Sequence, residues 1–506
     1  MLTASLTLDP AFTVGPVRPR TFGSFVEHLG RCVYTGIYDP EHPTADEDGF
    51  RQDVLDLVKE MGVTTVRYPG GNFVSNYQWQ DGIGPVGDRP RRLDLAWHCT
   101  EPNLVGLNEF MRWCKKAGVE PMMAINLGTA GVREALDLLE YCNVPSGTYW
   151  SDLRRSHGVE EPYRIKLWCL GNEMDGPWQT GHKTAHEYGR LAAEAGRAML
   201  QLDPSIELVA CGSSGSGMPT FGAWENTVLT EAYDQVDMIS AHAYYWPKDG
   251  DMDSFLASAV SMDRFIDDVV ATADAVRAAE KKDKRIQVSF DEWNVWYLGL
   301  DETKNPEGDD WPVAPRLLED IYNVADAVVV GNLLISLLRH TDRVYAASQA
   351  QLVNVIAPIF TEPHAEGGRA WRQTTFHPFA LTAAHAKGDV LQVAVKAPTH
   401  ETKEFGEVPL LDAVATHDAT TGEVALFVVN RSLDADASLD VDLRGFGEGL
   451  GVVEALTLHS AEWTWKATAA DATSVVPVAN DSAQVSGGHL TVQLPPVSWT
   501  MIRLAA

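Results

Sequence analysis

The chain has 506 residues, and its 40 basic and 70 acidic side chains give a formal net charge of −30. Proteins bind nucleic acids and anionic membranes through Lys and Arg, so this acidic excess argues against both kinds of partner. A hydrophobic content of 45% and a charged content of 22% are typical of a globular protein, and the length suggests two or three domains.

The N-terminal segment and the cysteines indicate a cytoplasmic location. Residues 1–15 contain no basic region followed by an apolar one, so we expect no secretory signal and a mature chain that starts there. The longest apolar stretch, Ala327 to Leu338, is shorter than the roughly 18 residues that span a bilayer, and it predicts a buried helix. Six cysteines without a CxxC pair are typical of reduced thiols.

Strand and helix patterns alternate over residues 16–384. Short apolar runs bounded by turn residues predict eight strands: Arg20 to His28, Val63 to Tyr68, Glu120 to Asn126, Ile165 to Asn172, Glu207 to Gly212, Val236 to Ala243, Arg285 to Glu292 and Ala346 to Val355. Helical periodicity predicts helices between them, among which are Asp53 to Met61, Leu107 to Lys116, Thr184 to Gln201, Met262 to Ala279 and Glu319 to Arg339. Eight such repeats predict an α/β fold, a (β/α)8 TIM barrel that forms the catalytic domain.

The pattern changes at about residue 385, where helical periodicity ends. The predicted strands there are short and joined by turns: Val390 to Val395, Leu411 to His417, Val424 to Val429, Ala437 to Leu443, Gly451 to Leu458 and Leu490 to Leu494. Their spacing predicts an all-β sandwich, jelly-roll-like, over residues 385–506. Residues 1–15 contain a further strand pattern, Thr3 to Val14, which we expect to pair with this sandwich.

Two of the predicted barrel strands end in a glutamate. Glu173 follows strand four and Glu292 ends strand seven, and reactive side chains of such barrels gather at the C-terminal ends of the strands. A lone glutamate in this position more often caps a helix or pairs with an arginine. Two of them at one rim favour glycoside hydrolysis, in which one carboxyl protonates the leaving oxygen and the other attacks the sugar or activates water.

Longer motifs around these glutamates resemble the family 51 α-L-arabinofuranosidases, which are retaining barrel glycosidases with the acid/base on strand four and the nucleophile on strand seven. The motifs are FGSFVEHLG at 22–30, VRYPGGNF at 66–73, WCLGNEMDGPWQ at 168–179, DEWNVWY at 291–297 and QLVNV at 351–355. They occur in the family's order, and the resemblance extends over essentially the whole chain.

The resemblance implies roles for particular residues. Glu173 matches the general acid/base and Glu292 the nucleophile of a double displacement, and Arg67 and Tyr244 match positions close to the nucleophile. The arabinose-binding set of the family is matched by Glu27, Asn72, Asn172 and Gln351. His242 resembles a further contact near the catalytic pair, although a lone strand histidine is more often a core residue. Trp97 and Trp296 are candidate platforms on which a sugar could stack, with ordinary core packing as the alternative.

The implied function is exo-acting, retaining hydrolysis of terminal α-L-arabinofuranosyl residues from arabinan- or arabinoxylan-derived oligosaccharides. Two alternatives stay open: an endo-β-glucanase or xylosidase on the same scaffold, and a carbohydrate-binding protein without activity. The acidic loop Asp301 to Arg316 could shape which substrate backbone is accepted. Members of the family tend to form homo-oligomers, often hexamers, so the resemblance implies a homo-oligomer.

We expect no cofactor and no metal. Gly82, Gly84 and Gly87 match a dinucleotide-binding pattern, but Pro85 lies within it and no helix pattern follows. The glycines after strand five lack the Lys of a phosphate-binding loop. His182 and His186 have the spacing of a helical metal pair, but a solvated helix face is the more frequent reason for such a pair.

Overall fold

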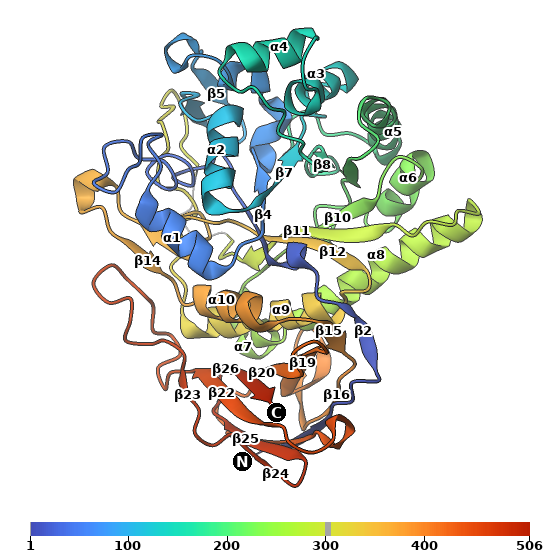
Figure 1. Cartoon of the computed structure of the whole chain (residues 1–506), viewed down its shortest axis with the longest axis vertical. Coiled ribbons are helices and arrows are strands. Elements are labelled where there is room, and N and C mark those ends of the chain that lie inside the picture. Colours follow the sequence, from blue (N-terminus) through green and yellow to red (C-terminus); the bar gives the residue numbers. More distant parts are fainter. Residues whose placement is uncertain (1, 299–304) are drawn as a thin grey trace.

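A computed structural model of the chain describes residues 2–298 and 305–506. Eight parallel strands close into a barrel in the upper part of Figure 1, and a β-sandwich lies below it. In chain order the barrel strands are β3 (Gly23–Phe25), β4 (Thr65–Tyr68), β7 (Glu120–Ala124), β8 (Leu167–Leu170), β9 (Glu207–Ala210), β10 (Met238–Tyr245), β11 (Gln287–Val295) and β12 (Val344–Gln349). The predicted fold, a barrel followed by a sandwich, is confirmed.

Helices surround the barrel (Figure 1). They are α1 (Gln52–Met61), α2 (Leu107–Ala117), α3 (Val132–Asn143), α4 (Tyr149–Ser156), α5 (Ala185–Leu202), α6 (Ala223–Ala232), α7 (Met252–Leu256), α8 (Ala259–Ala279), α9 (Val324–Arg339) and α10 (Phe376–His385). Helix α9 is buried from Val324 to Leu338 because it lies between the barrel and the sandwich, which explains its apolar sequence. Within the described ranges, no helix is both long and apolar enough to cross a membrane.

Several boundaries differ from the predicted ones, for example β12, which spans Val344–Gln349 instead of Ala346 to Val355. Three of the differences have local reasons. The first barrel strand is only three residues long, because Pro19 begins a 3-10 turn, Pro19–Phe22, and proline has no N–H for a strand ladder. Helix α9 begins at Val324 instead of Glu319, since the Asn323 side chain caps it by accepting a hydrogen bond from the N–H of Asp326. Strand β11 continues past Glu292 to Val295, so Glu292 lies inside the strand.

The sandwich consists of two sheets. The larger has the order β2 (Thr13–Pro16), β15 (Asp389–Leu391), β19 (Leu411–Asp418), β20 (Glu423–Asn430), β26 (Ser498–Ala505), β22 (Gly451–Leu458) and β23 (Val478–Ala479). The smaller has the order β16 (Ala394–Lys396), β1 (Leu2–Thr7), β21 (Ala437–Asp442), β25 (His489–Leu494) and β24 (Gln484–Ser486). The N-terminal segment therefore contributes one strand to each sheet, where the sequence predicted a single strand. The predicted strand Val390 to Val395 likewise divides between the two sheets.

Helix α9 joins the sandwich to the barrel. Gly331 is required there, because a Cβ atom at this position would lie 2.2 Å from the indole ring of Trp499 on β26. Beside this contact the buried carboxylate of Asp412 accepts hydrogen bonds from Asn332 of α9 and from Arg431, both at 2.8 Å. A buried charge of this kind is tolerated only when it is paired, so the network fixes the sandwich against the helix layer of the barrel.

Candidate active site

Glu173 and Glu292 meet at the C-terminal end of the barrel. Glu173 lies just beyond β8, where its left-handed backbone (φ 44°) turns the chain sharply, and Glu292 lies on β11. Both are buried, with 9% and 5% of their surface exposed. One carboxylate oxygen of each lies within 4.8 Å of the other and of a ring nitrogen of His242. Retaining glycosidases require two carboxyl groups about 5 to 5.5 Å apart, so the pair is close enough for that chemistry.

The carboxylate of Glu292 has a hydrogen-bond donor on each oxygen. Arg67 of β4 donates to Oε1 at 2.6 Å, and the Tyr244 hydroxyl of β10 donates to Oε2 at 2.7 Å. A second guanidinium N–H of Arg67 reaches Oδ1 of Asn172 at 2.7 Å. Gly71 allows this crowding, because a Cβ atom there would lie 3.3 Å from Oε1 of Glu292 and 3.1 Å from Oε2 of Glu27. The donors fix the orientation of Glu292 toward the cavity above it.

Glu173 is held between His242 and Trp178. Nδ1 of His242 lies 2.9 Å from Oε1, and the indole N–H of Trp178 donates to Oε2 at 2.8 Å. Burial raises the pKa of Glu173, the hydrogen bond from His242 opposes this rise, and the nearby charge of Glu292 adds to it. A carboxyl group with a raised pKa retains its proton at higher pH than an exposed one and is therefore suited to act as a general acid.

His242 links the acid to a third carboxylate. Its Nε2 lies 2.9 Å from Oδ1 of Asp291, which is buried beneath the site. Burial alone would lower the pKa of His242, but the charges of Glu292 and Asp291 and the bond to Glu173 raise it to about 10. Burial also disfavours the charge of Asp291, yet Arg67 and His242 hold the pKa of Asp291 below its usual value. The imidazole is therefore charged at neutral pH and donates from both nitrogens.

Glu27, which follows β3, receives hydrogen bonds from three donors. Its Oε1 accepts from the backbone N–H of Phe73 at 2.9 Å and from the indole N–H of Trp97 at 3.0 Å, and its Oε2 accepts from Nε2 of Gln351 at 3.1 Å. Burial is nevertheless the largest influence and raises the pKa of Glu27 to about 8. Nearby, Nδ2 of Asn172 donates to Oδ1 of Asn72 at 3.3 Å.

All eleven predicted site residues come together around one cavity of about 490 Å³. Eight of them border it: Glu27, Asn72, Trp97, Glu173, Tyr244, Glu292, Trp296 and Gln351. The other three, Arg67, Asn172 and His242, contact these residues through the hydrogen bonds described above. Both candidate tryptophans thus border the cavity, and the ring of Trp296 packs edge-on against Tyr244 at 5.0 Å. Asn305 also borders the cavity, while residues 301–304 of the acidic loop lie outside the described residues.

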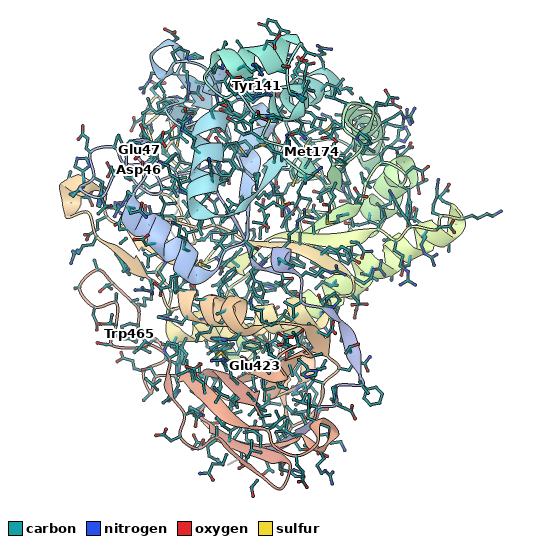
Figure 2. All side chains as sticks on the ribbon, viewed as in Figure 1. Asp46, Glu47, Tyr141, Met174, Glu423 and Trp465 are labelled. Carbon is teal, nitrogen blue, oxygen red and sulfur yellow. The ribbon has the colours of Figure 1, made fainter. Side chains whose placement is uncertain are left out.

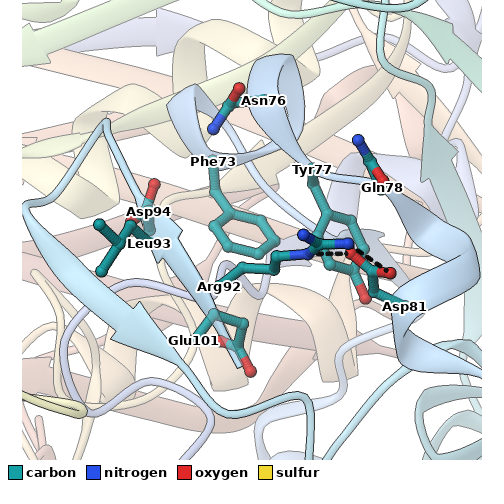
Figure 3. A pocket seen from close by; sticks show the side chains of 9 residues that line it. All are labelled: Phe73, Asn76, Tyr77, Gln78, Asp81, Arg92, Leu93, Asp94 and Glu101. Atoms are coloured by element: carbon teal, nitrogen blue, oxygen red, sulfur yellow. Dashed lines mark hydrogen bonds and ion pairs between the residues drawn. The ribbon is translucent and has the colours of Figure 1, made fainter. Parts of the chain in front are cut away.

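A second, more polar cavity of about 210 Å³ has Phe73 in its lining (Figure 3). The ion pair between Arg92 and Asp81, 2.7 Å long, and the buried carboxyl of Asp94 border it. Burial raises the pKa of Asp94 to about 7, and its Oδ1 accepts the backbone N–H of Ala96 at 3.0 Å. Asp94 therefore supports the turn that presents Trp97 to Glu27.

Two groups within the described ranges have the ligand spacing of a metal site. Glu173, His242 and Glu292 form one, but these side chains are already engaged with one another and with neighbouring donors and acceptors. Asp46, Glu47 and Asp48 form the other, and the ammonium group of Lys116 lies within 3 Å of each carboxylate. In Figure 2, Asp46 and Glu47 lie at the left edge of the molecule, well apart from Met174, the residue after Glu173.

The sequence did not identify Trp178 and Asp291 as members of the site. Trp178 is half-exposed, and the turn through Gly176 and Pro177 returns its indole to Glu173. A Gly-Pro turn followed by an aromatic residue just after a rim glutamate was a usable signal. Asp291 directly precedes Glu292, yet both carboxylates lie near the ring of His242, because the pairing of β11 with β12 shifts register between Phe290 and Trp293. Regular strand alternation would have put Asp291 on the other face, so the sequence offered no signal for it.

Several known proteins are similar to this chain. Residues 57–267 match the model of the α-L-arabinofuranosidase 1 domain, and residues 291–498 match that of the α-L-arabinofuranosidase C-terminal domain. An intracellular exo-α-(1→5)-L-arabinofuranosidase of Streptomyces lividans is 60% identical over all of this chain and 76% of its own length. An exo-α-(1→6)-L-arabinofuranosidase of Bifidobacterium longum is 56% identical over 99% of this chain and 97% of its own.

Solved structures are also similar. A family 51 α-L-arabinofuranosidase from Bifidobacterium longum has a TM-score of 0.94 and 52% identity, with 99% of each chain covered. An α-L-arabinofuranosidase from Thermotoga maritima, solved as an arabinose complex, has a TM-score of 0.88 and 33% identity over 99% of this chain and 100% of that one. Each of these relatives carries an arabinofuranosidase name, which disfavours the glucanase, xylosidase and binding-protein alternatives.

Proposed function

This chain belongs to the family 51 α-L-arabinofuranosidases, and on that premise we propose that Glu292 is the nucleophile and Glu173 the acid/base of its reaction. It is a glycoside hydrolase that removes terminal α-L-arabinofuranosyl residues from oligosaccharides. The observation that carries the assignment is the closeness of the two carboxyl groups, of which Glu173 has a raised pKa.

In the first step Glu292 attacks C1 of the arabinofuranosyl ring. The bond from C1 to the leaving oxygen breaks, a bond from C1 to a Glu292 oxygen forms, and Glu173 transfers its proton to the leaving oxygen. Arg67 and Tyr244 orient the attacking carboxylate. The product is an arabinosyl-enzyme ester of inverted configuration at C1.

In the second step the Glu173 carboxylate takes a proton from water while the water oxygen attacks C1 and Glu292 leaves. The two inversions restore the original configuration. Formation of the ester removes the negative charge of Glu292, which is one of the influences that raise the pKa of Glu173. The pKa of Glu173 therefore falls between the two steps, which suits its change from acid to base.

Sugar recognition is assigned to the wall opposite the leaving group. Each buried hydroxyl left unpaired costs about 1 to 3 kcal/mol, so several groups must converge on one furanose ring. Glu27, Asn72 and Gln351 present polar atoms to the cavity. We propose that Asn172, whose Oδ1 accepts a hydrogen bond from Arg67, binds the 2-hydroxyl, where hydrogen bonds strengthen in the transition state. Trp97 and Trp296 supply apolar surface for the ring's C–H groups.

For the linkage we infer a preference for α-(1→5)-linked arabino-oligosaccharides. Relatives named for this linkage are 60%, 52% and 51% identical to the chain, while one named for the (1→6) linkage is 56% identical. The test compares the rates at which the enzyme releases arabinose from three substrates. They are an α-(1→5)-linked arabinobiose, an α-(1→6)-linked arabinofuranoside and an arabinoxylan oligosaccharide. Faster release from either of the last two would overturn the inferred preference.

The activity itself is tested with 4-nitrophenyl glycosides. We expect hydrolysis of the α-L-arabinofuranoside and little hydrolysis of the β-D-xyloside or β-D-glucoside, because the relatives are named as α-L-arabinofuranosidases. Hydrolysis of only a pyranoside would contradict the proposed function. A Glu292→Ala variant should lose turnover on the arabinofuranoside, which ties the activity to this site.

Three further assignments are proposals. Relatives named as intracellular support a cytoplasmic location, where imported oligosaccharides are the accessible substrate. The implied assembly is a homo-oligomer, a hexamer by family resemblance, which light scattering of the purified chain would test. The division into an N-terminal strand at 1–15, a barrel at 16–384 and a sandwich at 385–506 is supported by the pairing of β1 with β16 and β21.

A further inference from the structure

A third cavity, of about 320 Å³, adjoins the active-site cavity. The two share Ser214, Tyr244 and Leu298 as bordering residues. The floor of the third cavity is formed by the loop that follows β9, at 214–217, and by the end of β10 and the residue after it, at 242–246. Its volume lies within the range of small-ligand sites, and the mechanism proposed above does not use it.

The barrel order places this cavity on the leaving-group side. Around the closed barrel, β9 lies opposite β3, and β8 lies opposite β12. Glu27 follows β3 and Gln351 follows β12, so the wall assigned to the terminal sugar is on the far side from the loop after β9. A substrate that places its terminal sugar against Glu27 and its scissile bond at Glu173 therefore extends toward Ser214.

The sandwich supplies one wall of this cavity. The hairpin formed by β17 (Thr399–Thr402) and β18 (Gly406–Pro409) carries Glu404 and Phe405 at its tip, and both border the cavity. The backbone N–H of Glu404 donates to Oγ of Ser254 on α7 at 3.1 Å, and Arg264 of α8 donates to the carbonyl oxygen of Phe405 at 3.3 Å. Figure 1 shows α7 next to the sandwich. The hairpin tip is thus fastened to the barrel at two points.

The side chains around the cavity suit a neutral, hydroxyl-rich ligand. Trp246 is half-buried and offers aromatic surface, and Ser214 and Ser216 offer hydroxyl groups. The charge of Lys248 is neutralised by Glu404, 3.0 Å away, so this pair attracts neither anions nor cations strongly. An aromatic ring beside hydroxyl and paired charged groups is a typical environment for a sugar ring.

We propose that this cavity is a subsite for the second sugar unit of the leaving group, counted from the scissile bond. The inference rests on the proposed function, because it takes Glu173 to mark the scissile bond. The first leaving unit lies between Trp178 and Ser214, and the second contacts Trp246 and the hairpin tip. The enzyme therefore prefers a trisaccharide, which reaches the cavity, to a disaccharide, which does not.

The test compares kcat/KM for α-(1→5)-linked arabinotriose, arabinobiose and 4-nitrophenyl α-L-arabinofuranoside. For the wild-type chain we expect the triose to exceed the biose about 5- to 10-fold, the scale of one aromatic contact. Trp246→Ala should reduce this ratio to about one by removing the contact. Ser216→Trp changes an exposed residue, and it should reduce the ratio equally by filling the cavity. Both variants should hydrolyse the nitrophenyl substrate at the wild-type rate, because it has no second unit.

Phe12→Ala serves as the control, since Phe12 is an exposed aromatic residue on the sandwich that borders none of these cavities. It should keep the wild-type ratio. A wild-type ratio near one, or a ratio that survives both Trp246→Ala and Ser216→Trp, would overturn the subsite while leaving the proposed function intact. Failure of the wild-type chain to hydrolyse any arabinofuranoside would overturn both.

Discussion

Replacing Glu27 with glutamine should stabilise the protein above neutral pH and abolish its activity. Glu27 is 2% exposed, and burial raises its pKa from 4.5 to about 8. A carboxyl group whose pKa is higher in the folded than in the unfolded chain stabilises the fold below pH 4.5. That contribution to stability is lost as the pH rises from 4.5 to 8. Over this range the Glu27 carboxyl loses its proton in the unfolded chain but keeps it in the folded chain, which favours unfolding.

The size of the effect follows from the shift. A difference of 8 minus 4.5, or 3.5 pKa units, corresponds to about 5 kcal/mol at 1.36 kcal/mol per unit, and about 4 kcal/mol of it is lost by pH 8. A chain of this length should gain about 1 °C in Tm per kcal/mol. Glu27→Gln should therefore melt about 4 °C above the wild type at pH 8 and show no such advantage at pH 5.

The surroundings can accept the amide. Oε1 of the glutamine can keep the bonds from Phe73 and Trp97. Its Nε2 would face Nε2 of Gln351, but Oε1 of Gln351 is buried and has no partner among the described residues, so rotation of that amide provides an acceptor. The substitution thus removes the ionisable group, and the rotation exchanges the unpaired Oε1 of Gln351 for its Nε2 at the same position.

Thermal melts of the wild type and Glu27→Gln at pH 5 and pH 8 check this expectation. Glu161→Gln is the control, because the Glu161 side chain is 86% exposed and its replacement should leave Tm unchanged at both pH values. Equal melting of wild type and Glu27→Gln at both pH values would refute the argument from burial. Retained activity in Glu27→Gln would refute the role of Glu27 in sugar binding.

Two further substitutions test the surroundings of Glu173. Trp178→Phe removes a donor that lowers the pKa of Glu173, so the basic limb of the kcat/KM profile should move to higher pH; an unchanged or lower limb would contradict this. Asp291→Asn removes the carboxylate that helps to raise the pKa of His242 to about 10. Steady-state kinetics should show kcat about 10- to 100-fold lower with KM nearly constant, and an unchanged kcat would argue against this positioning role.

The barrel and its central site could be predicted from the sequence because both depend on local patterns. Each barrel strand is a short apolar run bounded by turn residues, and parallel strands bring their C-terminal ends to one rim. Glu27, Glu173 and Glu292 follow or end such runs, so their meeting was predictable without knowledge of any contact. The family motifs added side chains that lie beyond the strand ends, such as Asn72.

Features that depend on distant contacts were not predictable in the same way. The segments Thr3 to Val14 and Val390 to Val395 each read as one strand, but each divides between two sheets that form only when the chain folds. The hairpin tip at Glu404 reaches the barrel through Ser254, which is 150 residues earlier in the chain. No periodicity in the sequence around Glu404 or around Ser254 indicates the contact between them.

Azide rescue tests the central claim, the assignment of Glu292 and Glu173, most directly. With an activated α-L-arabinofuranoside, Glu173→Ala still forms the ester on Glu292, so azide should displace it and give the α-azide. Glu292→Ala leaves space at the nucleophile's position, where azide should attack C1 directly and give the β-azide. NMR of the two products reads the configuration at C1. An α-azide from Glu173→Ala with a β-azide from Glu292→Ala is the predicted result, and the reverse pairing would contradict the assignment.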